Sequence, residues 1–187
     1  MNFIELMIIA IGVSMDAFAV SICKGLSVRT VRPKHVLSTG IWFGGFQALM
    51  PVMGYFVGIY FADLVASVDH WIAFVLLAII GSNMIKESLE KDCDDNIDPD
   101  FSFKTMFALA VATSIDALAI GVSFAFLKVN IWTSVLLIGL TTAAFSMIGV
   151  KVGNVFGSKY KSTAELLGGI ILVVMGIKIL VEHIFLK

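Results

Sequence analysis

The sequence is poor in charged residues. Only 14% of its 187 residues are charged and 59% are apolar, whereas about 25% of the residues in a soluble domain are charged. This balance is unlike that of a soluble enzyme and is typical of a chain embedded in lipid. The net charge of −1, with no basic cluster interleaved with aromatic residues, also argues against nucleic-acid binding.

Cysteine is scarce, and the first apolar run has no basic flank. Cys23 and Cys93 form no Cys-x-x-Cys motif and suggest no disulfide framework. Glu5 stands where a signal peptide would carry a basic residue, and Asp16 interrupts the apolar run that follows. We therefore expect this segment to remain in the mature protein.

Long apolar runs, in contrast, are abundant. A membrane-spanning helix needs roughly 20 mostly apolar residues, and a backbone surrounded by hydrocarbon must be helical. The third run is the shortest, so it is either a short span or a re-entrant segment. We predict an all-α polytopic membrane protein with six transmembrane helices, at residues 3–23, 36–61, 71–85, 105–127, 131–156 and 164–185.

Lysine and arginine are concentrated in alternate loops between the predicted spans. The positive-inside rule places the basic loops in the cytoplasm and both termini outside it. Cys23 and Cys93 would then lie on the cytoplasmic side, where thiols stay reduced. The basic residues on this side are Lys24, Arg29, Arg32, Lys34, Lys86, Lys91, Lys104, Lys159 and Lys161.

The first half of the sequence recurs in the second half. Residues 14–20 (SMDAFAV) align with residues 114–120 (SIDALAI) at an offset of 100, and the second and fifth spans align at an offset of 95. Each copy has three spans, an odd number, so the copies lie in opposite orientations, as in transporters with inverted repeats. We predict one repeat at residues 1–90, an acidic cytoplasmic linker at 91–104 and a second repeat at 105–187.

Each repeat carries one aspartate inside its first span. At 1.5 Å per residue, Asp16 and Asp116 lie roughly 12 and 18 Å from the basic residues that mark the cytoplasmic ends of their spans. These depths straddle the middle of a hydrocarbon core about 30 Å thick, so the two carboxylates could face each other. An acid at this depth usually marks a substrate or ion pathway. The alternative is a structural acid, protonated or paired with Lys151 or Lys178.

Two facing carboxylates suit a small divalent cation, which neutralises both. Hard cations such as Mn²⁺ and Mg²⁺ prefer oxygen ligands. The same carboxylates would bind protons when the metal leaves, so we predict exchange of protons for metal. We expect no catalytic residue and no prosthetic cofactor. The predicted metal site comprises Asp16, Asp116, Gln47, Ser14, Ser114, Thr142 and Asn83.

Several segments resemble the MntP family of bacterial manganese efflux pumps. They are SMDAFAVS, SIDALAIG, FGGFQALMPVMGYFVG, HWIAFVLLAIIGSNMI and LGGIILVVMGIKIL, and the likeness extends over nearly the whole chain. The resemblance implies export of Mn²⁺ across the cell inner membrane, a relation to LysE-type exporters, and functional roles for Asp16 and Asp116. The position of Gln47 can be acidic in similar proteins, which here would leave charge balance to the two aspartates.

The residues by themselves leave other functions open. Two aspartates on separate membrane helices could form an intramembrane aspartic protease, although neither lies in a Gly-x-Gly-Asp motif. The cargo could instead be an amino acid, as in LysE-type exporters, with Lys151 or Lys178 binding its carboxylate. We favour an exporter of divalent metal that works by alternating access and is not an enzyme. Its partners would be the metal ion, protons and the lipid bilayer.

Overall fold

The computed structural model describes residues 3–28, 30–65, 69–89, 101–156 and 161–185, and the regular structure in these ranges is helical. This confirms the all-α prediction. Most of the predicted linker, at residues 91–100, lies outside the described residues. The helices in the described ranges are α1 (Phe3–Ser27), α2 (Pro33–Val65), α3 (Asp69–Leu89), α4 (Phe103–Ala112), α5 (Ile115–Phe126), α6 (Ile131–Phe156) and α7 (Lys161–Phe185).

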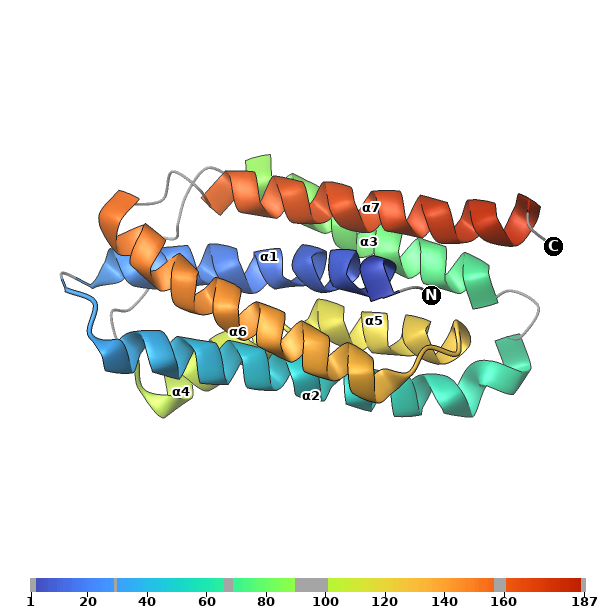
Figure 1. The fold of residues 1–187 in the computed structure, drawn as a ribbon, viewed down its shortest axis with the longest axis horizontal. Coiled ribbons are helices and arrows are strands. Elements are labelled where there is room, and N and C mark those ends of the chain that lie inside the picture. Colours follow the sequence, from blue (N-terminus) through green and yellow to red (C-terminus); the bar gives the residue numbers. More distant parts are fainter. Residues whose placement is uncertain (1–2, 29, 66–68, 90–100, 157–160, 186–187) are drawn as a thin grey trace.

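The helices form an elongated bundle and run along its length in alternating directions, with α4 and α5 together making one passage (Figure 1). α1 lies between the α3–α7 pair on one side and α2, α4 and α5 on the other, and α6 crosses over α1 and α2. α1 begins and α7 ends toward the same end of the bundle. The opposite end, where α1 ends, α2 begins and α6 ends, is called the basic end below, because it carries Lys24, Arg32 and Lys34.

Three helices are long and apolar enough to cross a membrane, at Phe3–Ser27, Pro33–Tyr60 and Ile131–Phe156. The α4–α5 pair, bent by 43° at its junction, adds a fourth if the pair is one broken span. The described residues therefore give three or four spans by length and composition, where the sequence predicted six. α3 has 21 residues, roughly 31 Å at 1.5 Å per residue, so it is longer than the third predicted span.

Large apolar side chains face outward and several polar ones face inward. On α6, Trp132, Leu136 and Leu140 recur every four residues and are 67%, 64% and 64% exposed. Gln47 and Thr142, in contrast, are completely buried. So much exposed apolar surface is unlike a soluble protein, in which large exposed apolar patches are few. The outer surface is therefore suited to lipid, as expected for a multi-pass membrane protein.

The predicted span over residues 105–127 is not one continuous helix: α4 ends at Ala112, α5 begins at Ile115, and Ser114 between them departs from helical geometry with φ of −114° and ψ of 7°. Two hydroxyls at this junction donate to carbonyl oxygens of the preceding turn, Thr113 Oγ1 to Leu109 at 3.0 Å and Ser114 Oγ to Ala110 at 2.6 Å. Such bonds compete with the backbone ladder and bend helices. Two in succession lie where α4 ends and α5 begins.

Glycines bring α2 and α6 into close contact. A Cβ added to Gly44 would lie 2.8 Å from the carbonyl oxygen of Gly139, and one added to Gly139 would lie 3.1 Å from that of Gly44. Gly44 also faces Ala143, and Gly139 faces Ala48. Each of these contacts is matched by another between residues 95 positions away in the sequence.

The other two crossings match each other in the same way. Gly54 of α2 packs against the carbonyl oxygen of Leu118 in α5, and Gly149 of α6 packs against that of Phe18 in α1. Gly58 likewise faces Val122, and Gly153 faces Ile22. The paired positions are those that the sequence offsets of 95 and 100 relate.

Candidate metal site

Hydroxyl and amide groups fill the core where α1, α2 and α6 meet. Ser14 Oγ of α1 lies 2.8 Å from Thr142 Oγ1 of α6, and Gln47 Nε2 of α2 donates to the carbonyl oxygen of Val13 at 3.2 Å. The side chains of Ser14, Gln47 and Thr142 are completely buried. Three helices distant in sequence thus contribute to one polar junction.

The hydrogen bonds fix the direction of the Ser14–Thr142 contact. Ser14 Oγ donates its only proton to the carbonyl oxygen of Ala10 at 2.6 Å. Thr142 must therefore donate to Ser14, since a hydroxyl has one proton and two lone pairs. The lone pairs of Thr142 Oγ1 are then available to accept a further donor or to bind a cation.

Two more buried oxygens lie on the same helices. Within the described part of the chain, Gln47 Oε1 and Ser146 Oγ have no hydrogen-bond partner. Ser146 lies one turn beyond Thr142 on α6 and is also completely buried. A buried polar atom without a partner costs about 1–3 kcal/mol, and such atoms often belong to functional sites or bind water or ions.

The two aspartates border the central core. Asp16 is half-buried in the middle of α1, and Asp116 lies in the first turn of α5 with both carboxylate oxygens buried. Their sequence neighbours Met15 and Ala117 belong to one buried cluster formed by α1, α3, α5, α6 and α7. The N-terminus of α5 favours negative charge at Asp116, because the helix dipole is positive there.

The structure brings together part of the predicted ligand set. Ser14 and Thr142 are in contact, and Gln47 joins them through Val13. Ser114 does not join this junction by a hydrogen bond that we observe, since its hydroxyl bonds to Ala110 and Val111 of its own chain segment. Asn83 is exposed on α3.

No group of three or more His, Cys, Asp or Glu side chains capable of holding a metal ion occurs among the described residues. A cation bound here would therefore need hydroxyl, amide or backbone oxygens, or water, in addition to carboxylates. Such oxygen-rich and partly hydrated coordination is normal for hard divalent ions. The chemistry of the junction fits a hard cation better than a soft one.

Comparison with known proteins assigns the family. The family model described as "Putative manganese efflux pump" (Mntp) matches residues 30–180. The chain belongs to the MntP family. A Campylobacter jejuni (strain RM1221) relative is 58% identical, with 99% of each chain covered. Relatives from Acetivibrio thermocellus and Desulfitobacterium hafniense (strain Y51) are 57% and 56% identical over 98% of this chain, covering 93% and 97% of their own lengths. All three carry the family's description with the name MntP, and no solved structure matches the chain.

This MntP-family chain also contains polar contacts that the sequence did not reveal. Ser146 is not in the predicted ligand set, and its burial without a hydrogen-bond partner among the described residues emerges only from helix packing. Lys178 of α7 forms an ion pair with Glu5 of α1. Asn154 Nδ2 donates to the carbonyl oxygen of Val28 at 2.8 Å and thereby binds the end of α1 to α6.

The prediction of reduced thiols is wrong for Cys23. This residue is disulfide-bonded in the structure. The chain has one other cysteine, Cys93, which lies outside the described residues. Spacing could not indicate the bond, because disulfide formation requires the two residues to approach within about 7 Å.

Proposed function

We propose that the chain exports divalent metal, with Mn²⁺ as its cargo, across the cell inner membrane. Its family and the names of its relatives support export of manganese. The observation that carries the proposal is the buried junction of Ser14, Gln47, Thr142 and Ser146, which involves the helix that carries Asp16. It supplies neutral oxygens of the kind that complement carboxylates around a hard cation.

The two halves are proposed to be inverted repeats that together cross the membrane six times. The matched contacts support this. If a twofold axis relates the two halves, each contact between two residues recurs between the two residues to which the axis relates them. Gly44 and Gly139 face each other reciprocally, as expected near such an axis. The alternating directions of the helices along the bundle also support it (Figure 1).

The proposed ligands are Asp16, Asp116, Gln47 and Thr142, with Ser14 holding Thr142 in place. Ser114 and Asn83 would contribute only in another conformation, because the hydroxyl of Ser114 is bonded locally and Asn83 is exposed here. Two carboxylates and one divalent cation are neutral together, and so are two protonated carboxyls. Replacing the metal by two protons therefore leaves the charge buried at the site unchanged.

Transport would proceed by alternating access, with the two repeats rocking about this site. Protonation of Asp16 and Asp116 from the outside would release the metal, and deprotonation toward the cytoplasm would allow reloading. The break at Thr113–Ser114 is a candidate hinge, since interrupted helices commonly lie at transporter binding sites.

The basic end is proposed to face the cytoplasm, with both termini on the opposite side. Lysine and arginine determine orientation during insertion, whereas a disulfide forms after the chain is in place. The basic residues therefore set the orientation in this proposal, and the disulfide at Cys23 would be an exception to the rarity of such bonds in a reducing compartment.

The test is metal flux into or out of proteoliposomes that contain a Mn²⁺-sensitive dye and an imposed pH gradient. Asp16→Asn and Asp116→Asn should each reduce the flux at least roughly tenfold, as expected when metal-site interactions are lost. Gln47→Leu should weaken apparent affinity for Mn²⁺. Thr39→Val is the matched control, because Thr39 is equally buried on α2 but bonds only to His35 of its own helix.

Flux that survives both aspartate substitutions would show that the acids are structural. Flux in the native protein that does not depend on the pH gradient would contradict proton exchange but would still support metal export. Export of a basic amino acid that persists in Asp16→Asn, without Mn²⁺ flux in the native protein, would favour the LysE-type cargo. Cleavage of a membrane peptide abolished by either substitution would favour the protease.

A further inference from the structure

Two cavities on the α2–α6 face are neighbours that share one lining residue. The larger, about 640 Å³, lies at the basic end and is lined by residues of the α1–α2 turn, α2 and α6. The smaller, about 300 Å³, follows the crossing of α2 and α6 toward the middle of the bundle. Met147 lines both cavities. A cavity of several hundred Å³ is in the usual range for binding a small molecule.

The two cavities differ sharply in chemistry. The larger has Arg32, Lys151 and Asn154 among its described lining residues, and none of the described lining residues is acidic. Arg32 and Lys151 are exposed. The smaller is lined only by apolar residues and glycines, including Gly40, Gly44 and Gly45. A cavity with a cationic lining thus adjoins an apolar groove.

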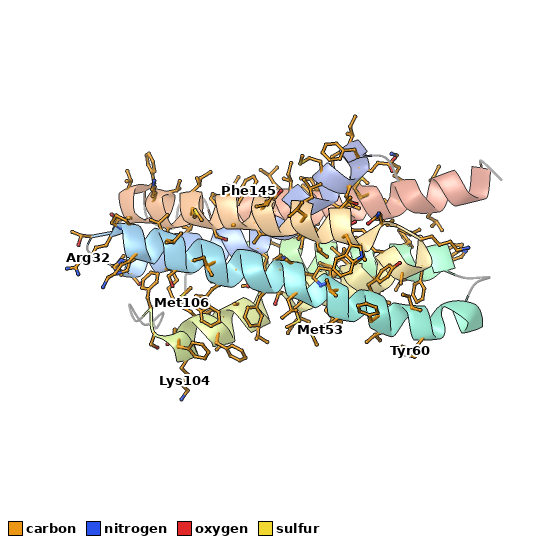
Figure 2. All side chains as sticks on the ribbon, turned by 60° about the horizontal axis from the view of Figure 1, so that its bottom comes forward. Arg32, Met53, Tyr60, Lys104, Met106 and Phe145 are labelled. Atoms are coloured by element: carbon orange, nitrogen blue, oxygen red, sulfur yellow. The ribbon has the colours of Figure 1, made fainter. Side chains whose placement is uncertain are left out.

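This feature opens on the surface that would contact lipid. Ile41, Leu136 and Leu140 line the smaller cavity and are 62%, 64% and 64% exposed. Lys151 lies five residues before the end of α6, roughly 7.5 Å by helix rise, which is the depth of a membrane interface. Arg32 extends at the start of α2, at the end of the bundle opposite Tyr60 (Figure 2).

We propose that this feature, called the α2–α6 groove, binds one anionic glycerophospholipid. Arg32 and Lys151 contact the phosphate headgroup, and an acyl chain lies along Ile41, Gly45 and Leu136. Basic pockets between membrane helices bind anionic headgroups in this way. Charge complementarity favours an anionic lipid as the ligand rather than a second copy of the chain. An identical partner would bring more positive charge to the cavity lined by Arg32 and Lys151. The proposal is independent of the transported cargo.

The structure provides a substitution that fills the groove without disturbing the core. A Cβ added at Gly45 would meet no atom within 4 Å, so Gly45→Leu can extend into the space predicted for the acyl chain. Gly45→Ala is its control, because one methyl group should leave the groove open. For the headgroup, Arg32→Gln combined with Lys151→Gln removes both charges. Lys104→Gln combined with Lys128→Gln is the charge-matched control, and Lys104 points away from the bundle on α4 (Figure 2).

The experiment is native mass spectrometry of delipidated full-length protein titrated with phosphatidylglycerol or phosphatidylcholine carrying the same acyl chains. The native protein should bind phosphatidylglycerol at least tenfold more tightly. Loss of Arg32 and Lys151 should weaken that binding about thirtyfold, from the usual contribution of two basic residues at a membrane surface. Gly45→Leu should weaken binding of both lipids, whereas both control variants should behave as the native protein. Thermal unfolding of each variant shows whether it remains folded.

Three outcomes would overturn the proposal. Equal binding of the two lipids would exclude headgroup selection, and an undiminished preference in the Arg32 and Lys151 variant would place the anionic site elsewhere. The native protein could instead show the mass of two chains and the Gly45→Leu variant the mass of one. That result would assign the groove to a second copy of the protein.

Discussion

The segments around Asp16 and Asp116 share a sequence motif but differ in structure. Asp16 lies in the middle of α1, an unbroken helix of 25 residues. Asp116 lies in the first turn of α5, directly after a break and a 43° bend. Two copies of one motif thus present their acids differently, one from a helix interior and the other from a helix N-terminus.

The difference arises two and three residues before each aspartate. Ser14 and Ser114 both donate to the carbonyl oxygen four residues earlier, at 2.6 Å. In the second copy Thr113 adds another such bond, whereas Val13 has no hydroxyl to do so. Ser14 also contacts Thr142, which supports α1 from outside. The shared motif therefore preserves the position of the acid, while one additional hydroxyl accompanies the break in the helix that carries it.

The largest effect should come from overpacking the close helix contacts that recur in both halves. Gly54→Ala and Gly153→Ala each place a methyl group where a carbonyl oxygen of the facing helix lies. Each should lower the free energy of unfolding by about 3 kcal/mol, the upper part of the usual range for overpacking. Denaturation in mixed micelles measures it, with Gly45→Ala as the unaffected control. Tolerance of one substitution and not the other would break the equivalence of the two crossings.

A smaller effect should follow from an asymmetry between the halves. Glu5 and Lys178 form an ion pair in which the side chains are 12% and 42% exposed, while the positions that correspond by offset are Thr105 and Asn83. Glu5→Gln should cost about 1 kcal/mol of stability, because the pair is partly screened by solvent. Asn83→Ala should cost less than about 0.5 kcal/mol, as for surface changes. The double variant Glu5→Lys with Lys178→Glu should restore stability if the contribution of the pair comes from charge. If stability is not restored, the contribution comes from packing.

The break itself can be weakened at Thr113. Thr113→Val removes one hydrogen bond worth about 1 kcal/mol, which should shift the balance between broken and straight helix about fivefold. Spin labels at the exposed positions Phe103 and Lys128 in a cysteine-free background should then report a longer distance. Val13→Thr is the reciprocal variant and should weaken the continuity of α1. An unchanged distance in Thr113→Val would assign the break to packing against α2.

The smallest effect concerns how the two matched helices end. Lys128 follows α5 with φ of 53°, and Val129 N–H donates to the Phe124 carbonyl oxygen at 3.0 Å, which is a Schellman turn. Glycine adopts this conformation without steric cost, so Lys128→Gly should stabilise the protein by about 0.5–1 kcal/mol. Thermal unfolding measures the gain. The end of α1 relies on Asn154 instead, so Val28→Gly should not stabilise it, and an equal gain there would contradict this distinction.

Much of this protein was predictable because its signals are local. The apolar runs gave the helical class, and the family followed from extended segments such as SMDAFAVS and LGGIILVVMGIKIL. The offsets of 95 and 100 also predicted which glycines would play equivalent roles, since periodic small residues mark the faces on which membrane helices approach. The prediction of six spans is not confirmed, because length and composition qualify three or four spans among the described residues.

The candidate site was predictable in part. Asp16, Asp116, Ser14, Gln47 and Thr142 were identified because polar groups are costly in an apolar helix. Only the tertiary structure decided that Ser14 meets Thr142, that Gln47 binds to Val13, and that Ser146 remains buried without a partner. The same holds for the broken helix, the Glu5–Lys178 pair and the α2–α6 groove. The sequence determined which residues could do chemistry within the membrane, because burial in lipid restricts residue type. Which of them meet depends on how the helices cross, and crossing geometry is set by contacts among all the helices together.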